Sequence, residues 1–291
     1  MGIGILQAEQ LRHDRGGHLA HAVIVDARPR DQYLQGHIPG AIWMGWESWC
    51  GPAPRRGGPA LARSGYWGVL ERASGEDYGH RLGSHGLCDD RPIVVYGDGP
   101  RTRGREGRVA WMLLYLGASD VYLLDGGWSN WLAQRGEVQV GTESPTHRHF
   151  TVRFRPERRR TLRSLRARFR TGTLPVLIDA RSRAEFDGEI QDYVPRGGHL
   201  VGACLVPFAD LFEPDNRYVA REQYLKMLPH EARQASNLVA YCEVGVRAAL
   251  LAMLHEAYTG QVVSVYDGSI MQWAHERDLP MSNALSEPSV L

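Results

Sequence analysis

"VIVDARPRDQYLQGHIPGA", residues 23–41, occurs a second time in the chain as "VLIDARSRAEFDGEIQDYVPRGGHLVGA", residues 176–203. Both copies run from a β-branched segment through Asp-Ala-Arg and a polar segment to Gly-His and then Gly-Ala. The second copy carries an insertion before its Gly-His. Internal similarity of this kind indicates a duplicated structural unit, so we predict that the chain has two similar halves.

Two further pairs of segments repeat in the same order. "PIVVYGDG" (92–99) corresponds to "NLVAYCEV" (237–244), and "VYLLDGGWSNW" (121–131) corresponds to "VVSVYDGSIMQW" (262–273). Between these apolar runs lie stretches with helical periodicity, such as "VRAALLAMLHEAY" after residue 245. Short apolar strands that alternate with helices predict an α/β fold, with a mostly parallel central sheet flanked by helices in each half.

Length, charge and apolar content limit the class of protein. A chain of 291 residues suits two domains, and 43% of its residues are hydrophobic. The formal net charge of +1 gives no electrostatic reason to expect a nucleic-acid or membrane partner. No apolar run reaches the roughly 18 residues of a membrane-spanning helix, and the first residues lack the apolar region of a signal peptide. We expect neither feature.

The cysteine pattern bears on metals and location. Four cysteines occur far apart in the chain: Cys50, Cys88, Cys204 and Cys242. They form no Cys-x-x-Cys pair, so no metal site is expected, and reduced thiols are typical of the cytoplasm, which is the predicted location. "YGDGPRTRG" (96–104) has Thr102 where a dinucleotide fingerprint needs its third glycine, so no cofactor is expected either.

An arginine-rich segment, "VRFRPERRRTLRSLRARFRTG" (152–172), separates the halves. We interpret it as a solvated linker in which Leu162, Leu165 and Phe169 pack one side of a short helix. An anion-binding or nucleic-acid patch is the alternative, but no aromatic residues are arranged for base stacking. The predicted division is a first domain over 1–140, a linker over 141–172 and a second domain over 173–291.

Cys242 stands where an apolar run ends and a short glycine-containing segment leads into a helix. Backbone N–H groups of such a loop, with those of the helix start, can converge on an anion, and a thiolate is an anion. Gly245 gives the loop conformational freedom, and Arg247 adds a cation. A structural buried cysteine is the alternative, but the counterpart in the first half is Gly97, so the strand end does not require a cysteine.

Other polar residues are interpreted by the same comparison. His37 and His199 follow glycines at matched positions, so a role in the fold is favoured over catalysis. Arg28 and Arg181 also match, but Arg181 shares its half with Cys242 and is therefore a candidate for the pocket. The remaining three cysteines are interpreted as structural.

These motifs resemble those of the tandem-domain rhodaneses, the thiosulfate and 3-mercaptopyruvate sulfurtransferases. "DARPRDQYLQGHIPGA" is similar to the first signature of the family and "DGGWSNW" to the second. The resemblance covers nearly the whole chain. It implies two rhodanese-like domains, the first inactive and the second catalytic. It also implies that Cys242 is the catalytic residue.

The resemblance further implies that residues 242–247 form the active loop, whose other members are candidates for substrate binding: Glu243, Val244, Gly245, Val246 and Arg247. In the implied mechanism Cys242 takes the outer sulfur of a small-molecule donor as a persulfide. A thiol or cyanide then removes that sulfur.

The loop sequence favours one donor. The loop of this chain reads Cys-Glu-Val-Gly-Val-Arg. Loops that resemble those of animal thiosulfate enzymes read Cys-Arg-Lys-Gly-Val-Thr, and those that resemble mercaptopyruvate enzymes read Cys-Gly-Ser-Gly-Val-Thr. The central Gly-Val is shared with both. Val244 replaces the serine of the second kind. A terminal arginine such as Arg247 is similar to that of bacterial and single-domain rhodaneses. We therefore predict a thiosulfate sulfurtransferase, with 3-mercaptopyruvate sulfurtransferase as the alternative.

Two alternatives from other classes stay open. A cysteine-dependent phosphatase needs Cys-x5-Arg, whereas Cys242 and Arg247 form the shorter Cys-x4-Arg, which disfavours it. A non-catalytic persulfide carrier or anion-binding module would use the same loop without turnover.

Overall fold

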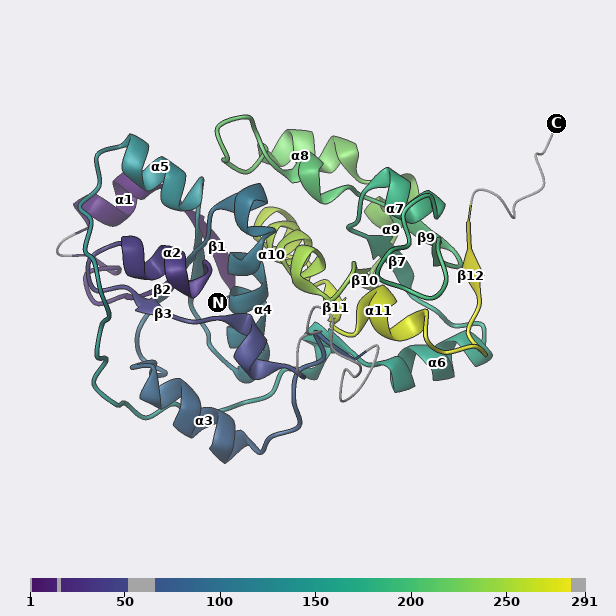
Figure 1. The fold of residues 1–291 in the computed structure, drawn as a ribbon, viewed down its shortest axis with the longest axis horizontal. Coiled ribbons are helices and arrows are strands. Elements are labelled where there is room, and N and C mark those ends of the chain that lie inside the picture. Colours follow the sequence, from purple (N-terminus) through teal and green to yellow (C-terminus); the bar gives the residue numbers. More distant parts are fainter. Residues whose placement is uncertain (1, 15–16, 52–65, 284–291) are drawn as a thin grey trace.

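The computed structural model describes residues 2–14, 17–51 and 66–283 (Figure 1). It contains two five-stranded sheets, of order β1-β5-β4-β2-β3 and β6-β11-β10-β7-β9. Every pairing within them is parallel. The two orders are the same once the strands are matched along the chain, so the predicted duplication and the mostly parallel sheets are confirmed.

The first half contains the following elements: β1 (Ile3–Leu6), α1 (Ala8–His13), β2 (Val23–Asp26), α2 (Arg30–Gln35), β3 (Ile42–Trp43), η1 (Trp46–Trp49), α3 (Gly75–Ser84), β4 (Ile93–Tyr96), η2 (Gly99–Thr102), α4 (Arg105–Leu116), β5 (Val121–Leu124) and α5 (Gly127–Ala133).

The second half contains the matching series: η3 (Pro156–Arg158), β6 (Arg159–Arg160), α6 (Leu162–Arg170), β7 (Val176–Asp179), α7 (Arg183–Asp187), β8 (His199–Leu200), β9 (Ala203–Leu205), η4 (Phe208–Leu211), α8 (Arg221–Met227), α9 (His230–Gln234), β10 (Leu238–Tyr241), α10 (Val246–Thr259), β11 (Ser264–Tyr266), α11 (Ser269–Trp273) and β12 (Met281–Ser282). A separate antiparallel pair joins β12 to β8.

The central strands are apolar because both of their faces are covered. All four residues of β4 are buried, as are all four of β10. Strands buried on both faces read as continuous apolar runs without alternation. These two strands are also the ones whose carboxyl ends lead into α4 and α10, so they fix where each following loop starts.

The repeated Asp-Ala-Arg motifs build the same buried contact in both halves. Arg28 donates to Asp26 and, at 2.6 Å, to the carbonyl of Gly36. Arg181 donates to Asp179 and, at 2.7 Å, to the carbonyl of Gly198. Each arginine ties the end of a strand to the Gly-His segment, which is the role in the fold that a matched pair predicts.

The two halves meet through α4 and α10, which lie side by side at the centre of the molecule (Figure 1). A Cβ at Gly107 would lie 2.3 Å from the Cα of Leu250, so a glycine is needed for this close approach. One apolar cluster includes buried residues of both helices and of both sheets. The halves therefore share a core and hold each other in place.

The arginine-rich range packs on the second half. β6 pairs with β11, and α6 buries Leu162 and Leu165 in a cluster with residues of the second sheet. Residues 141–172, predicted as a linker, thus include two elements that belong to the second sheet layer. In the described part of the chain no helix is long and apolar enough to cross a membrane.

Candidate active site

Cys242 directly follows β10, and α10 begins at Val246. Gly245, between them, has φ of +80°, a left-handed conformation that glycine adopts without strain. A Cβ at this position would lie 2.8 Å from Nη1 of Arg108 and 2.9 Å from Asp267. Both the backbone turn and the surrounding space therefore require glycine here.

The thiol of Cys242 is held by loop and neighbouring groups. Its side chain is buried, and Sγ accepts the backbone N–H of Gly245 at 3.2 Å. The backbone N–H of Cys242 donates to Oγ of Ser269 at 3.1 Å. Ser269 is itself left-handed, with φ of +52°, so a non-glycine residue is kept at a position that costs backbone energy.

The peptide groups after Cys242 have a fixed orientation. The carbonyls of Cys242 and Glu243 accept the N–H groups of Ile270 and Met271 in α11. In a trans peptide the C=O and N–H point in opposite directions. The N–H groups of Glu243 and Val244 consequently point away from α11, and they have no hydrogen-bond partner among the described residues. Beside the free N–H groups of the first turn of α10, they can bind an anion.

A cavity of about 150 Å³ opens over this loop. It is lined from both halves by Trp46, Glu47, Trp67, Thr102, Arg103, Arg105, Cys242, Glu243, Val244, Val246 and Arg247. The rings of Trp46 and Trp67 lie 5.5 Å apart and form an apolar wall. Since a water molecule takes up about 30 Å³, the cavity suits a substrate of only a few non-hydrogen atoms.

Arg247 is occupied by a carboxylate. Its Nη1 and Nη2 donate to the two oxygens of Glu185, both at 2.8 Å, and both side chains are largely buried. Burial opposes ionisation of Glu185, but the hydrogen bonds and charge of Arg247 outweigh it and hold the pKa of this carboxyl well below its ordinary value. The positive charge of Arg247 is thus matched by a fixed negative charge.

Glu243 faces the mouth of the cavity. Its carboxylate lies 3.0 Å from Nη2 of Arg103, which belongs to the first half, and 3.7 Å from Nη2 of Arg247. Arg105, also from the first half, pairs with Glu47 and donates to the carbonyl of Ala27 at 2.7 Å. Each of these cavity arginines therefore has a carboxylate next to it.

A family model described as a rhodanese-like domain matches residues 7–134 and 161–276. The chain belongs to the rhodanese-like family. Each matched range contains four of the five strands of one sheet, and only β1 and β6 lie just before them, so the predicted α/β fold of two rhodanese-like domains is confirmed.

Relatives and a solved structure agree with this assignment. A Corynebacterium glutamicum protein named thiosulfate sulfurtransferase is 28% identical over 260 residues, which are 86% of this chain and 80% of that protein. An Escherichia coli protein named 3-mercaptopyruvate sulfurtransferase is 25% identical over 261 residues, covering 88% and 86%. The crystal structure of SseA from Escherichia coli has a TM-score of 0.72 at 23% identity, covers 91% of this chain and 98% of that one, and supports the fold.

The structure places most of the predicted site residues together in the second rhodanese-like domain. Cys242, Glu243, Val244, Val246 and Arg247 line the cavity, and Gly245 forms the turn beneath it.

Arg181 does not line the cavity. It is buried against Asp179 and the carbonyl of Gly198, as Arg28 is in the first half. We assign it to the fold.

The first rhodanese-like domain contributes residues that sequence reasoning missed: Trp46, Glu47, Trp67, Thr102, Arg103 and Arg105. One signal was available for Thr102 and Arg103. "YGDGPRTRG" is the counterpart of the active loop, and its position after β4 places it at the equivalent edge of the first sheet. Because α4 packs on α10, that edge faces Cys242.

The other cysteines do not line the cavity over Cys242. Burial raises the pKa of the Cys50 and Cys88 thiols, and it raises the pKa of Cys204 to about 11. A raised pKa keeps a thiol protonated and unreactive. These environments agree with the structural roles predicted from the sequence.

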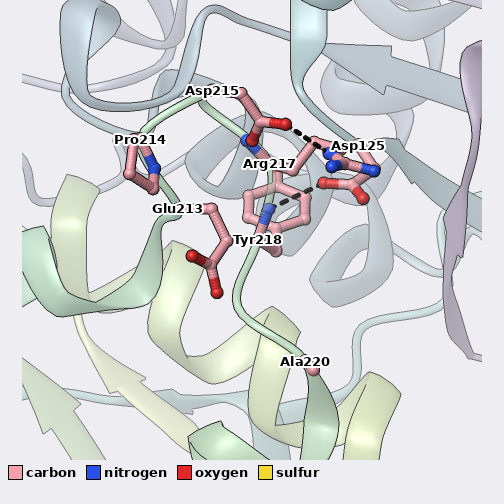
Figure 2. A pocket seen from close by; sticks show the side chains of 7 residues that line it. All are labelled: Asp125, Glu213, Pro214, Asp215, Arg217, Tyr218 and Ala220. Atoms are coloured by element: carbon pink, nitrogen blue, oxygen red, sulfur yellow. Dashed lines mark hydrogen bonds and ion pairs between the residues drawn. The ribbon is translucent and has the colours of Figure 1, made fainter.

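A second cavity, of about 510 Å³, lies where Asp125 meets the segment 213–220 (Figure 2). Asp125 accepts the N–H of Tyr218 at 2.7 Å, and Asp215 pairs with Arg217. Burial raises the pKa of Asp125. Its described lining shares no residue with the cavity over Cys242, so the two sites are separate.

Proposed function

We propose that this chain is a thiosulfate sulfurtransferase in which Cys242 carries the sulfur as a persulfide. The observation that supports it best is the thiol at the base of a small cavity, with the backbone N of Gly245 at 3.2 Å from its sulfur. The N–H groups of residues 243 and 244 lie beside it and have no partner in the described part of the chain. These donors suit a sulfur that is negatively charged before, during and after transfer.

In the first step the Cys242 thiolate attacks the outer sulfur of thiosulfate. A bond forms between Sγ and that sulfur, and the bond to the sulfonate sulfur breaks, so that sulfite leaves with the electron pair. In the second step cyanide or an acceptor thiolate attacks the terminal persulfide sulfur, and the Cys242 thiolate leaves. No external oxidant or reductant is needed, and no metal or cofactor takes part in the proposed steps.

Each rhodanese-like domain has a separate task in this proposal. We assign catalysis to the predicted second domain, 173–291, and the cavity wall to the predicted first domain, 1–140. At Gly97, the counterpart of Cys242, a Cβ would lie 2.0 Å from Oε2 of Glu106. Glu106 therefore fills the space that a nucleophile would need, and the first domain is proposed to be inactive.

The donor is proposed to be thiosulfate because Val244 supplies no hydroxyl to the loop, and because the cavity fits a small anion. 3-Mercaptopyruvate is the alternative donor, since relatives named for it are similar to this chain. We place the reaction in the cytoplasm because all four cysteines are free thiols.

A direct assay tests the function. The protein is incubated with thiosulfate and then cyanide, and thiocyanate is measured. Turnover is expected in the wild type and none in Cys242→Ser. Intact-mass and peptide analysis after thiosulfate alone should find one added sulfur on Cys242. Sulfur on Cys50, Cys88 or Cys204, or hydrolysis of p-nitrophenyl phosphate without sulfur transfer, would refute the assignment. Persulfide formation without turnover would indicate a carrier.

A further inference from the structure

Among the described residues, three arginines line the cavity over Cys242, and each has a carboxylate partner. Arg247 pairs with Glu185, Arg105 with Glu47, and Arg103 with Glu243. For an anionic donor to bind directly to one of these three guanidinium groups, the corresponding ion pair must open. The pair that opens at least cost therefore identifies the residue that binds the donor.

The pair between Arg247 and Glu185 is the most expensive to open. Its two parallel hydrogen bonds are both 2.8 Å, and the side chains are 11% and 10% exposed. Tyr193 donates a further hydrogen bond to Glu185. Separating a buried bidentate pair leaves an uncompensated buried charge, which proteins tolerate poorly. Arg247 is consequently held in place and is not free to meet a substrate.

Arg105 is also restrained. Its side chain is 15% exposed, its Nη2 donates to Glu47 at 2.6 Å, and its Nε donates to the carbonyl of Ala27. The guanidinium is thus fixed to the backbone as well as to a carboxylate, and moving it would break contacts of two kinds.

Arg103 is more exposed and less restrained than Arg247 and Arg105. Its side chain is 66% exposed, and its hydrogen bond to Glu243, at 3.0 Å, is single. Ion pairs at this level of exposure contribute little to stability because water and salt screen them. An anion that enters the mouth of the cavity can replace the Glu243 carboxylate as the partner of Arg103 with almost no loss.

The backbone conformation of Arg103 is an independent reason to assign a function to this residue. It has φ of +57°, and Gly104 after it is also left-handed. A glycine would adopt this conformation without cost, whereas a side chain with a Cβ is strained there. Residues kept in such conformations concentrate at functional sites. The strain at Arg103 is explained if its guanidinium has a task at the mouth of the cavity.

We propose that Arg103, supplied by the inactive first domain, is the specificity-determining residue for the donor. It leaves Glu243 and binds the anionic oxygen group of the donor, which is the sulfonate in thiosulfate, while the loop amides hold the transferred sulfur. Glu243 competes with the donor for the same guanidinium. This inference rests on the proposed sulfur transfer at Cys242.

The test compares steady-state kinetics with thiosulfate and cyanide for three single variants. Arg103→Gly suits the left-handed backbone, so the melting temperature should not fall, while KM for thiosulfate should rise about tenfold, as expected for loss of a charge-assisted hydrogen bond, with kcat nearly unchanged. Glu243→Gln should lower KM, because the competitor is neutralised. Arg101→Gln is the matched control, since Arg101 is equally exposed on the same segment but pairs with Asp98 outside the cavity. It should leave KM unchanged.

The double variant and a mass measurement separate the possible failures. Arg103→Gly combined with Glu243→Gln should have a KM close to that of Arg103→Gly alone, because the competition proposed for Glu243 is for the guanidinium of Arg103. If saturating thiosulfate places no sulfur on Cys242 in the wild type, the proposed function is refuted and this inference with it. If Cys242 takes up sulfur but Arg103→Gly has the wild-type KM, the function stands and the role of Arg103 is refuted.

Discussion

Glu106 occupies in the first domain the place that Arg247 occupies in the second, one residue into the helix that follows the loop. It is 1% exposed, and its Oε2 has no hydrogen-bond partner among the described residues. Its Oε1 lies 3.5 Å from the hydroxyl of Tyr218, across the domain interface. Burial, with a smaller contribution from the charge of Asp98, raises the pKa of Glu106 from its ordinary value to about 7.

The sign and size of the effect on stability follow from this pKa. The folded state keeps the Glu106 proton up to about pH 7, whereas the unfolded chain releases it near pH 4.5. Between these values the folded state binds more protons, so the free energy of unfolding falls as the pH rises. One pKa unit corresponds to about 1.4 kcal/mol. The free energy of unfolding should therefore fall by about 3 kcal/mol between the two pKa values of Glu106.

Glu106→Gln removes this titration but keeps the shape of the side chain. We expect the free energy of unfolding of the variant, relative to wild type, to increase by about 3 kcal/mol between pH 4 and pH 8. Urea denaturation at several pH values measures it. Glu76→Gln, at an exposed site on α3, is the control and should show no such trend. A constant difference between Glu106→Gln and wild type would refute the reasoning, because Glu106 would then be ionised in the folded protein.

Three further substitutions test the site and the interface. Arg247→Ala leaves the Glu185 carboxylate buried and alone, so the free energy of unfolding should fall by about 3–5 kcal/mol; an unchanged melting temperature would contradict the buried pair. Gly107→Ala places a Cβ against the backbone of Leu250 and should cost at least about 1–3 kcal/mol in urea denaturation by forcing α4 from α10; wild-type stability would mean that the helices can shift freely. Ser269→Gly relieves the left-handed backbone but removes the hydroxyl that accepts the Cys242 N–H. Its melting temperature should change little while sulfur uptake slows, and an unchanged uptake rate would show that this hydrogen bond does not position the thiol.

The two similar, mostly parallel sheets and the position of Cys242 at a strand end could be predicted because each depends on local pattern. Apolar runs such as residues 92–96 and 237–241 are recognisable without knowing their neighbours, and the repeat then gives the same topology twice. The loop after β10 follows from Cys242 and Gly245 alone. The same local reasoning suggested that Arg247 is the substrate cation, because a cation near the thiol is all that a linear sequence shows.

The contribution of the first domain to the cavity could not be predicted in this way. Trp46, Trp67 and Arg103 reach Cys242 only because α4 packs on α10, and that packing depends on Gly107 fitting against Leu250. No periodicity or spacing along the chain carries this information. The sequence also gives no indication that a strained backbone at residue 103 carries an arginine toward the opposite domain.

The partner of Arg247 was nevertheless visible in the repeat. Nδ1 of His37 donates to the carbonyl of Tyr33, and Nδ1 of His199 donates to the carbonyl of Phe186. Tyr33 therefore corresponds to Phe186, and the residues just before them correspond to each other.

Glu185 therefore corresponds to Gln32, as Arg247 corresponds to Glu106. The second domain has the carboxylate of Glu185 and the guanidinium of Arg247. The first domain has the amide of Gln32 and the carboxyl of Glu106, so both positions differ between the domains. An acid at position 185 is useful only if a cation stands at 247, because a buried charge needs its counterpart. Without a guanidinium at the position of Arg247, an uncharged side chain is favoured at the position of Glu185, and the first domain has Gln32 there. The comparison of the duplicated positions thus agrees with the pairing of Arg247 and Glu185. It is also consistent with the proposal that Arg103 of the other domain binds the donor.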